Sequence, residues 1–303
     1  KLYGLKFQIS KQEGYHRDVQ VYNVTDFKGN WVSHLLTDWH PRKGKRNGAW
    51  MTSYRKAYQR NTTRVYPIIS LVCNFSTSSD GKPALLTFNE VLTLFHEFGH
   101  GIHGMLGEGK YATLTGTSVA WDFVELPSQF MENWCFEATE LKQWARHYTS
   151  GEPMPDSIIT NIKKSQKFLE GMATIRQLGL GLLDMAWHNP SNKEILDYKK
   201  LEESIFADLE LWSKEPGVTI SSAFSHIFSG GYSAGYYSYK WSEVLDADAF
   251  SRFSNEPDNS EVAQDFKKLL KAGGSIDPSV LFKNFMGREP NINALLTRAG
   301  LDE

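Results

Sequence analysis

The stretch His96-Glu97-Phe98-Gly99-His100 lies inside a segment with the apolar spacing of a helix. Side chains four residues apart lie on the same face of an α-helix, so two imidazoles can point at one metal ion. Tetrahedral Zn²⁺ takes histidine ligands of this kind, and the glutamate after the first histidine can act on a water molecule as a general base. The stretch therefore predicts zinc ligands at His96 and His100, with Glu97 as the base.

The flanking residues favour a helix here. Asn89 or Thr87 is a candidate N-cap, apolar residues recur at helical spacing after it, and Gly104, Gly107 and Gly109 are expected to end the helix. An ordinary helix with two half-buried histidines, paired to backbone or carboxylate groups, is the alternative to a metal site.

A third ligand has to come from elsewhere in the chain. His103 shares the face of the motif, but a rise of ~1.5 Å per residue puts it ~10 Å from His96 along the helix axis, too far to share a metal. A second helix is expected after Asp122, and Pro127 fits only in its first turn. Glu125 is then near that helix's start, either as a ligand or as a capping-box acid. The residues alone leave both open.

A second cluster of chemistry-bearing residues follows His226. Residues 230–239 combine glycines, which permit a flexible loop, with four tyrosines. Tyr236 and Tyr239 share a helical face, while Tyr237 points elsewhere. Phenol and imidazole donors beside such a loop suit a site where negative charge develops on an oxygen. An aromatic helix packed in the core is the alternative, and it is our interpretation for Tyr237.

The histidine motif belongs to a longer pattern, made of residues 96–103 with 115–117 and 122–129, and of further segments at residues 44–46, 71–75, 226–239 and 285–290. This pattern resembles the thimet oligopeptidase family of zinc peptidases, whose members include oligopeptidase A and dipeptidyl carboxypeptidase. The resemblance covers nearly the whole chain. It implies one Zn²⁺ per chain, held by His96, His100 and Glu125, with Glu97 as the general base.

The resemblance also assigns the second cluster. It implies that His226 and Tyr239 donate hydrogen bonds to the transition state, and that Tyr232 and Tyr236 hold the substrate backbone. The implied substrates are short peptides. An endo-acting oligopeptidase is slightly favoured over a dipeptide-releasing carboxypeptidase of the same family. A catalytically inactive peptide-binding relative is a further alternative, although the intact Glu97 argues against it, because binding a metal requires only the ligands.

The expected architecture is mainly α with a small β-sheet, an α+β fold. Residues 17–39 are predicted to form a hairpin and residues 62–75 a strand. That strand either lies at a sheet edge, where it receives the substrate backbone, or in the sheet interior. Helical spacing recurs after Trp134, at residues 138–149, 156–187, 193–213, 239–250 and 258–272.

The resemblance implies that this architecture is a zincin-like catalytic domain. Residues 1–303 are expected to form that single zinc-peptidase domain, as the C-terminal catalytic half of a longer protein whose N-terminal helical region is absent here.

Charge and composition limit the classes of partner that are expected for this protein. The formal net charge of −2 gives no basic surface for nucleic acid or an anionic membrane, and no apolar run is long enough to span a bilayer. Cys73 and Cys135 are expected to be buried free thiols, which fits a cytoplasmic protein, and a monomer is expected. Residues 41–48 are basic, with Lys43, Lys45 and Arg46. A solvated loop is the default interpretation, and contact with a substrate carboxylate is the alternative.

Overall fold

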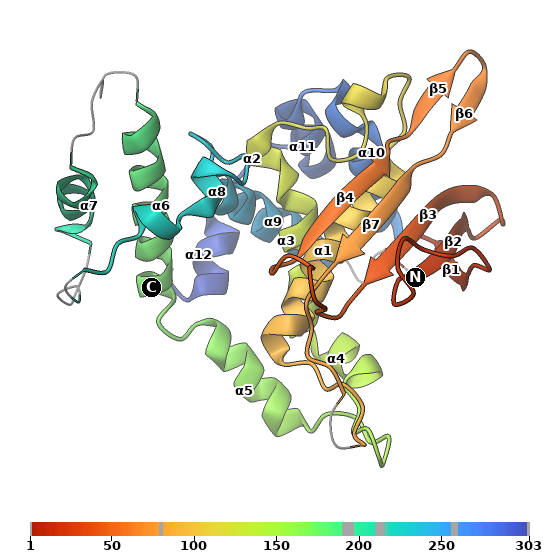
Figure 1. Cartoon of the computed structure of the whole chain (residues 1–303), viewed down its shortest axis with the longest axis horizontal. Helices are drawn as coiled ribbons and strands as arrows, with labels where there is room; N and C mark the ends of the chain where they lie inside the picture. Colours follow the sequence, from red (N-terminus) through yellow and green to blue (C-terminus); the bar gives the residue numbers. More distant parts are fainter. Residues whose placement is uncertain are drawn as a thin grey trace.

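The computed structural model describes residues 2–78, 81–189, 197–209, 215, 217–255 and 260–301. About half of these residues are helical, and one small mixed sheet lies at one side of the molecule (Figure 1). The α+β prediction is confirmed at this level. Within the described ranges, no helix is both long enough and apolar enough to cross a membrane.

The main sheet has the strand order β1-β2-β3-β7-β4. Its strands are β1 Leu5–Ile9, β2 Gln20–Asp26, β3 Trp31–Asp38, β4 Trp50–Arg55 and β7 Ile68–Val72, while β5 Tyr58–Arg60 and β6 Thr63–Val65 form a separate hairpin. Strands β2 and β3 pair antiparallel, which confirms the hairpin predicted at residues 17–39.

The strand predicted at residues 62–75 becomes β6 and β7, and β7 lies inside the sheet. It pairs parallel with β3 on one side and antiparallel with β4 on the other. The edge-strand interpretation of this segment is therefore wrong, because the edges of this sheet are β1 and β4. Four of the five β7 residues are buried, the pattern of a strand covered on both faces.

The predicted helical segments contain helices with different ends, and α8, α11 and α12 were not among the predicted segments. Their bounds are α1 Phe88–Leu106, α2 Trp121–Val124, α3 Leu126–Glu132, α4 Ala138–Trp144, α5 Asp156–Gln166, α6 Glu170–His188, α7 Tyr198–Phe206, α8 Ser225–Phe228, α9 Ser238–Asn255, α10 Ser260–Ala272, α11 Pro278–Met286 and α12 Asn293–Ala299. The single helix predicted at residues 156–187 is wrong, because Leu169 is left-handed (φ 56°) and separates α5 from α6. The segment predicted at 193–213 lies partly outside the described residues, and α7 is its described part.

Helix α1 is the central element, packed on the sheet on one side and on α3 on the other (Figure 1). Thr87 is its N-cap, in a capping box with Glu90, so Asn89 is not the cap. The helix ends at Leu106 with Gly107 as its C-cap. Gly104, which was expected to end the helix, instead lies within it, where a Cβ would meet the side chains of Met51 and Ile69.

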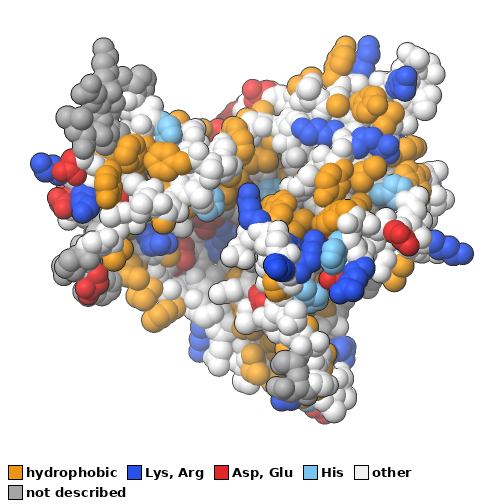
Figure 2. Space-filling view, viewed as in Figure 1, with side chains coloured by type: hydrophobic (Ala, Val, Ile, Leu, Met, Phe, Trp, Pro, Cys, Tyr) orange, Lys and Arg blue, Asp and Glu red, His pale blue; other side chains and the backbone are white. Residues whose placement is uncertain are grey.

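The apolar core has a main part and a satellite. The main cluster joins the sheet with α1, α3, α9, α10 and α11, and the satellite cluster joins α6, α7 and α8. Figure 2 shows the part that carries α6 and α7 standing apart from the sheet-bearing body, with a hollow between them. Both cysteines are buried and free, as predicted.

Candidate active site

Three potential metal ligands from two elements converge at the start of α3. His96 and His100 project from α1, and Glu125 lies at the junction of α2 and α3. Glu125 Oε2 lies 3.3 Å from His96 Nε2 and 3.1 Å from His100 Nε2. One ligand atom from each residue falls within 4.8 Å of the others. The structure therefore brings together the three residues that the sequence placed at a metal.

The spacing of these atoms fits zinc. Zinc bonds to histidine nitrogen and carboxylate oxygen are about 2.0–2.2 Å long, so two ligand atoms of a tetrahedral site lie roughly 3.3–3.5 Å apart. Both distances from Glu125 Oε2 are close to that range. His103, by contrast, is fully buried away from this point, and burial lowers its pKa to about 3.

Close packing of α1 on α3 carries Glu125 to the histidines. A Cβ on Gly99 would lie 2.6 Å from Ser128 Cα, so this glycine lets the two backbones approach. Pro127 is in the first turn of α3, as expected. The side chain of Glu125 makes no capping hydrogen bond, and Ala120 rather than Asp122 is the N-cap of α2. The capping-box interpretation of Glu125 is therefore wrong.

Further polar groups orient these ligands. The sequence indicated neither Glu132 nor Ser128, and it assigned Tyr232 a different role. Glu132, at the end of α3, pairs through Oε1 with His96 Nδ1 at 2.7 Å, which directs Nε2 of that ring toward Glu125. Ser128 Oγ donates to Glu125 Oε2 at 2.8 Å. The Tyr232 hydroxyl donates to Glu125 Oε1. Glu132 is seven residues after Glu125, two helical turns along one face, and this spacing is the signal that could have identified it.

The charges around the ligands favour an ionised Glu125. Burial alone would raise the pKa of Glu125, but His100 and His96 beside it hold that pKa well below its ordinary value. Burial alone would likewise lower the pKa of His96, but Glu125 and Glu132 raise it well above the ordinary range. An ionised carboxylate is the form that binds a cation.

Glu97 lies beside the ligands without joining them. It is 6% exposed, and its Oε2 has no hydrogen-bond partner among the described residues. Burial raises the pKa of Glu97, and the carboxylate lines the same cleft as His96 and His100. A buried carboxylate with one oxygen unpaired, facing a cleft, is suited to accept a proton from a small molecule held there.

The predicted donors surround one imidazole. The ring of His226, on α8, lies 6.1 Å from the rings of Tyr232 and Tyr239 and 5.9 Å from that of Tyr236. Tyr232 stacks on Tyr239 and meets Trp121 edge-on. His226, Tyr232 and Tyr239 line the cleft together with the metal-ligand candidates.

The surroundings of Tyr236 and Tyr237 differ from those that the sequence predicted. Tyr236 is 8% exposed, donates to Gln177 Oε1 at 3.1 Å and lines a neighbouring cavity rather than the main cleft. Tyr237 is 48% exposed, and its hydroxyl lies 3.3 Å from Asp122 Oδ2. The prediction that Tyr237 packs in the core is wrong, because its position after Gly235 turns the side chain outward rather than onto the satellite cluster.

Asp184 of α6 anchors the tyrosine loop. It is fully buried and accepts hydrogen bonds from the backbone N–H groups of Ala234 (2.9 Å) and Tyr236 (2.8 Å). It also pairs with His188 Nδ1 at 2.8 Å. The backbone that presents Tyr232 and Tyr236 is thus tied to α6, a contact that no local sequence pattern indicates.

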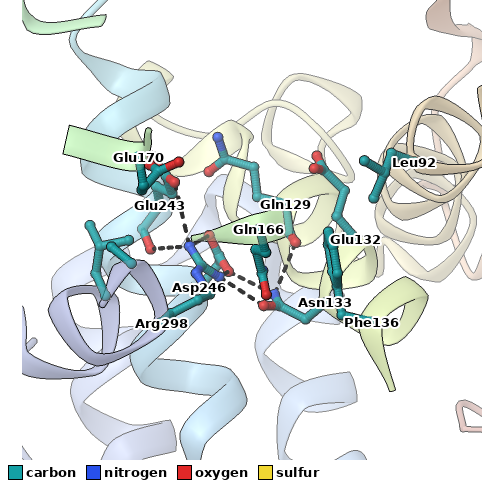
Figure 3. Close-up of a pocket in the computed structure, with 12 residues that line it drawn as sticks. Leu92, Gln129, Glu132, Asn133, Phe136, Gln166, Glu170, Glu243, Asp246 and Arg298 are labelled. Carbon is teal, nitrogen blue, oxygen red and sulfur yellow. Dashed lines mark hydrogen bonds and ion pairs between the residues drawn. The ribbon is translucent and has the colours of Figure 1, made fainter. Parts of the chain in front are cut away.

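The cleft beside the metal-ligand candidates has a volume of about 820 Å³. A second cavity of about 480 Å³ shares His96, His226 and Tyr239 with it. Beyond lies a small pocket of about 170 Å³ (Figure 3), which shares Gln129 and three glutamates with the second cavity. The pocket is lined by an ion pair in which the partly buried Arg298 donates through Nη1 to the buried Asp246 Oδ1 at 2.5 Å. The hollow thus extends from the metal-ligand candidates toward α12.

The fold is that of known peptidase structures. The structure described as PZ peptidase A with inhibitor 2 superposes with a TM-score of 0.59 at 16% sequence identity, covering 87% of this chain and 42% of that one. Sequence comparison is more specific. Residues 1–301 match the model of Peptidase family M3, and the chain therefore belongs to that family. The resemblance inferred from the sequence is confirmed.

Curated relatives lie at about 40% identity. Oligopeptidase A of Haemophilus influenzae is 43% identical over 298 residues, covering 95% of this chain and 43% of the relative. Dipeptidyl carboxypeptidase of Salmonella typhimurium is 38% identical over 295 residues, again covering 95% of this chain and 43% of the relative. The chain thus spans less than half the length of these relatives.

Proposed function

We propose that this chain is the catalytic part of a zinc metallopeptidase that hydrolyses short peptides. One observation carries the proposal, namely the convergence of His96, His100 and Glu125 next to the buried Glu97 in a cleft. Membership of Peptidase family M3 supports the same proposal. We further propose that residues 1–303 form one zincin-like domain, because the main core joins the sheet to the helices that carry the ligands.

The proposed cofactor is one Zn²⁺ per chain. The distances between Glu125 Oε2 and the two Nε2 atoms fit a tetrahedral site, and Glu132 supplies the carboxylate that often orients a zinc-bound histidine. When bound by these three residues, zinc would supply a Lewis acid that lowers the pKa of water and polarises a peptide carbonyl.

Residues of the chain then carry out the proton transfers. Glu97 accepts the proton of the attacking water and returns it to the leaving amine. Its unpaired oxygen and its raised pKa suit both halves of that exchange. Tyr239 and His226 donate hydrogen bonds to the oxygen on which charge develops, an effect of about 3 kcal/mol per donor in well-studied sites.

The substrate backbone is proposed to lie along β4. This strand pairs only with β7 among the described strands, and its first residues, Trp50 and Met51, line the cleft with His96 and Glu97. An extended peptide can add to such an edge through main-chain hydrogen bonds. Tyr232 is proposed to contact the bound backbone from the opposite wall, and Tyr236 from the neighbouring cavity.

An endo-acting oligopeptidase is favoured slightly, and relatives named oligopeptidase A and dipeptidyl carboxypeptidase both match the chain. An inactive peptide-binding relative is the alternative from a different class, and Glu97 argues against it. We propose a cytoplasmic monomer, since two buried free thiols fit a reducing compartment.

The test replaces Glu97 by Gln in the zinc-loaded chain. Zinc content should remain at one per chain, because the three ligands stay, while cleavage of a quenched fluorogenic peptide falls by at least about a hundredfold. Glu108→Gln is the control, since Glu108 is a partly exposed residue paired with Arg64 and Lys271. Normal turnover in Glu97→Gln would refute the mechanism, and mass spectrometry of the products separates internal cleavage from dipeptide release.

A further inference from the structure

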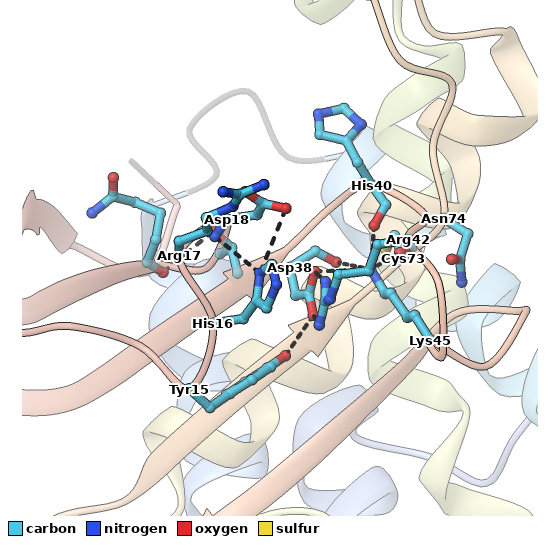
Figure 4. Close-up of polar contacts among 12 residues, drawn as sticks. Tyr15, His16, Arg17, Asp18, Asp38, His40, Arg42, Lys45, Cys73 and Asn74 are labelled. Carbon is cyan, nitrogen blue, oxygen red and sulfur yellow. Dashed lines mark hydrogen bonds and ion pairs between the residues drawn. The ribbon is translucent and has the colours of Figure 1, made fainter.

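The basic loop at residues 41–48 is held in place by one buried carboxylate. Asp38, 1% exposed at the end of β3, receives two hydrogen bonds from Arg42, at 2.6 and 2.8 Å (Figure 4). Lys45 Nζ donates to Asp38 Oδ1 at 2.9 Å and to the carbonyl of His40 at 2.9 Å, and its side chain is 3% exposed. Tyr15 donates to the other oxygen of Asp38 at 2.7 Å. Arg42 and Lys45 are therefore engaged within the protein and are not free to bind a substrate.

Arg46 differs from these neighbours. The amide of Asn74 donates to the carbonyls of Arg46 (3.0 Å) and Gly48 (2.7 Å), so the loop backbone is fixed on both sides of residue 47. The Arg46 side chain is exposed, and its guanidinium carbon lies 5.0 Å from the centroid of the Trp50 ring. No acidic side chain among the described residues pairs with it.

Arg46 also lines the cleft that contains the metal-ligand candidates, and it is the single lysine or arginine among the described residues of that lining. The contact with the indole ring is a cation–π contact, which leaves N–H groups of the guanidinium available for a ligand. Those groups match the two oxygens of a carboxylate. The cleft therefore presents one oriented and unpaired cation.

The direction of β4 indicates which end of a peptide meets this cation. Antiparallel pairing is slightly more stable per residue than parallel pairing, so a peptide added to β4 is expected to run antiparallel to it. Residue 46 lies just before the start of β4 at Trp50. An antiparallel peptide therefore points its C-terminal end toward Arg46.

We propose that Arg46 binds a carboxylate on the C-terminal side of the bound peptide, and that this contact sets a preference for peptides with a free C-terminus near the cleaved bond. The inference rests on the proposed peptidase function. An acidic side chain on the same side of the peptide offers the same chemistry, so the experiment must separate the two sources.

Binding measured without turnover provides the test. The chain carries Glu97→Gln and is loaded with zinc, and fluorescence anisotropy follows a hexapeptide labelled at its amino terminus. The peptide is made with a free C-terminal carboxylate and as the carboxamide, and a third version is the carboxamide with Asp in place of Asn next to the C-terminus. We expect the free acid to bind about tenfold more tightly than the carboxamide, which corresponds to about 1.4 kcal/mol.

Substitutions in the loop identify the cation. Arg46→Gln in the same background should remove the preference for the acid and leave binding of the carboxamide unchanged. Arg46→Lys should keep part of the preference, because the charge remains without the two-pronged geometry. Lys43→Gln is the matched control, since Lys43 is an exposed cation of the same loop that does not line the cleft, and it should keep the full preference.

Each outcome decides the question. A preference for the free acid that survives Arg46→Gln, or equal binding of all three peptides by the parent, would overturn the Arg46 site while leaving the proposed peptidase function intact. Loss of binding by all three peptides would instead contradict the proposed function. Tighter binding of the Asp-containing carboxamide, without a preference for the free acid, would overturn the C-terminal assignment and identify an acidic side chain as the ligand of Arg46.

Discussion

Gly99→Ala tests whether the contact between α1 and α3 builds the metal site. A methyl group at Gly99 would lie 2.6 Å from Ser128 Cα, whereas carbon atoms in contact are about 3.5–4.0 Å apart. The start of α3 must therefore retreat by about 1 Å to restore normal contact. Glu125 is one residue before α3, so the carboxylate moves with it, and ligand distances in a zinc site tolerate only about 0.2 Å.

Gly99→Ala should lower both the free energy of unfolding and the affinity for zinc. Overpacking of this size costs about 1–3 kcal/mol, and replacing a helical glycine by alanine returns about 0.5–1 kcal/mol, so the free energy of unfolding should fall by about 1–2 kcal/mol. Urea unfolding in the presence of a chelator measures this loss without a contribution from zinc. Competition with a chromogenic chelator should show zinc affinity reduced by at least about tenfold, the lower end of the loss seen when the groups that orient a ligand are removed.

Gly101→Ala is the matched control on the same helix. Its Cβ would face β7 and meet only the end of the Leu71 side chain, at 3.0 Å, which can move aside. Zinc affinity should stay normal in this variant, and the unfolding free energy should change by less than about 0.5 kcal/mol, because the gain in helix propensity offsets the tighter contact. Equal stability and equal zinc affinity in the two variants would refute the idea that Gly99 sets the position of Glu125.

Two further predictions concern the groups around the ligands. Glu132→Ala should weaken zinc affinity by about 10–100-fold, measured by chelator competition, because His96 loses the carboxylate that orients it. Unchanged affinity would show that Glu132 has no role in orienting His96. Tyr239→Phe should lower kcat with little change in KM, while Tyr237→Phe, at a half-exposed position, leaves both within about threefold. The reverse pattern would assign the donor role to Tyr237.

Local spacing was sufficient to predict two of the three metal-ligand candidates. His96 and His100 are one helical turn apart, so any helix through this stretch directs both rings to the same side. Glu125 could not be placed in this way. Its position depends on how closely α3 approaches α1, which Gly99 controls from a distant part of the sequence. The residues left its role open, and only the resemblance to a family indicated it.

The order in which the strands pair could not be predicted from the sequence either. A strand was predicted at residues 62–75, but nothing local states whether it takes an edge, and the strand β4 was not predicted at all. The break between α5 and α6 has a similar origin, since the left-handed residue there is Leu169 and is itself neither glycine nor proline. Local sequence patterns indicate the propensity of a segment for helix or strand. The order of the strands and the break between α5 and α6 depend instead on contacts with other parts of the fold.

The metal-ligand candidates and the tyrosine loop are supported by different parts of the fold. The metal-ligand candidates belong to α1 and the start of α3, within the main core. The tyrosine loop belongs to a different support, because Asp184 of α6 holds its backbone and α6 packs in the satellite cluster. A shift of α6 relative to α1 would therefore move Tyr232 and Tyr236 while leaving the spacing of His96 and His100 unchanged. The position of these two tyrosines and the spacing of the two histidines thus depend on different parts of the fold, and the hydrogen bond from Tyr232 to Glu125 joins the two parts.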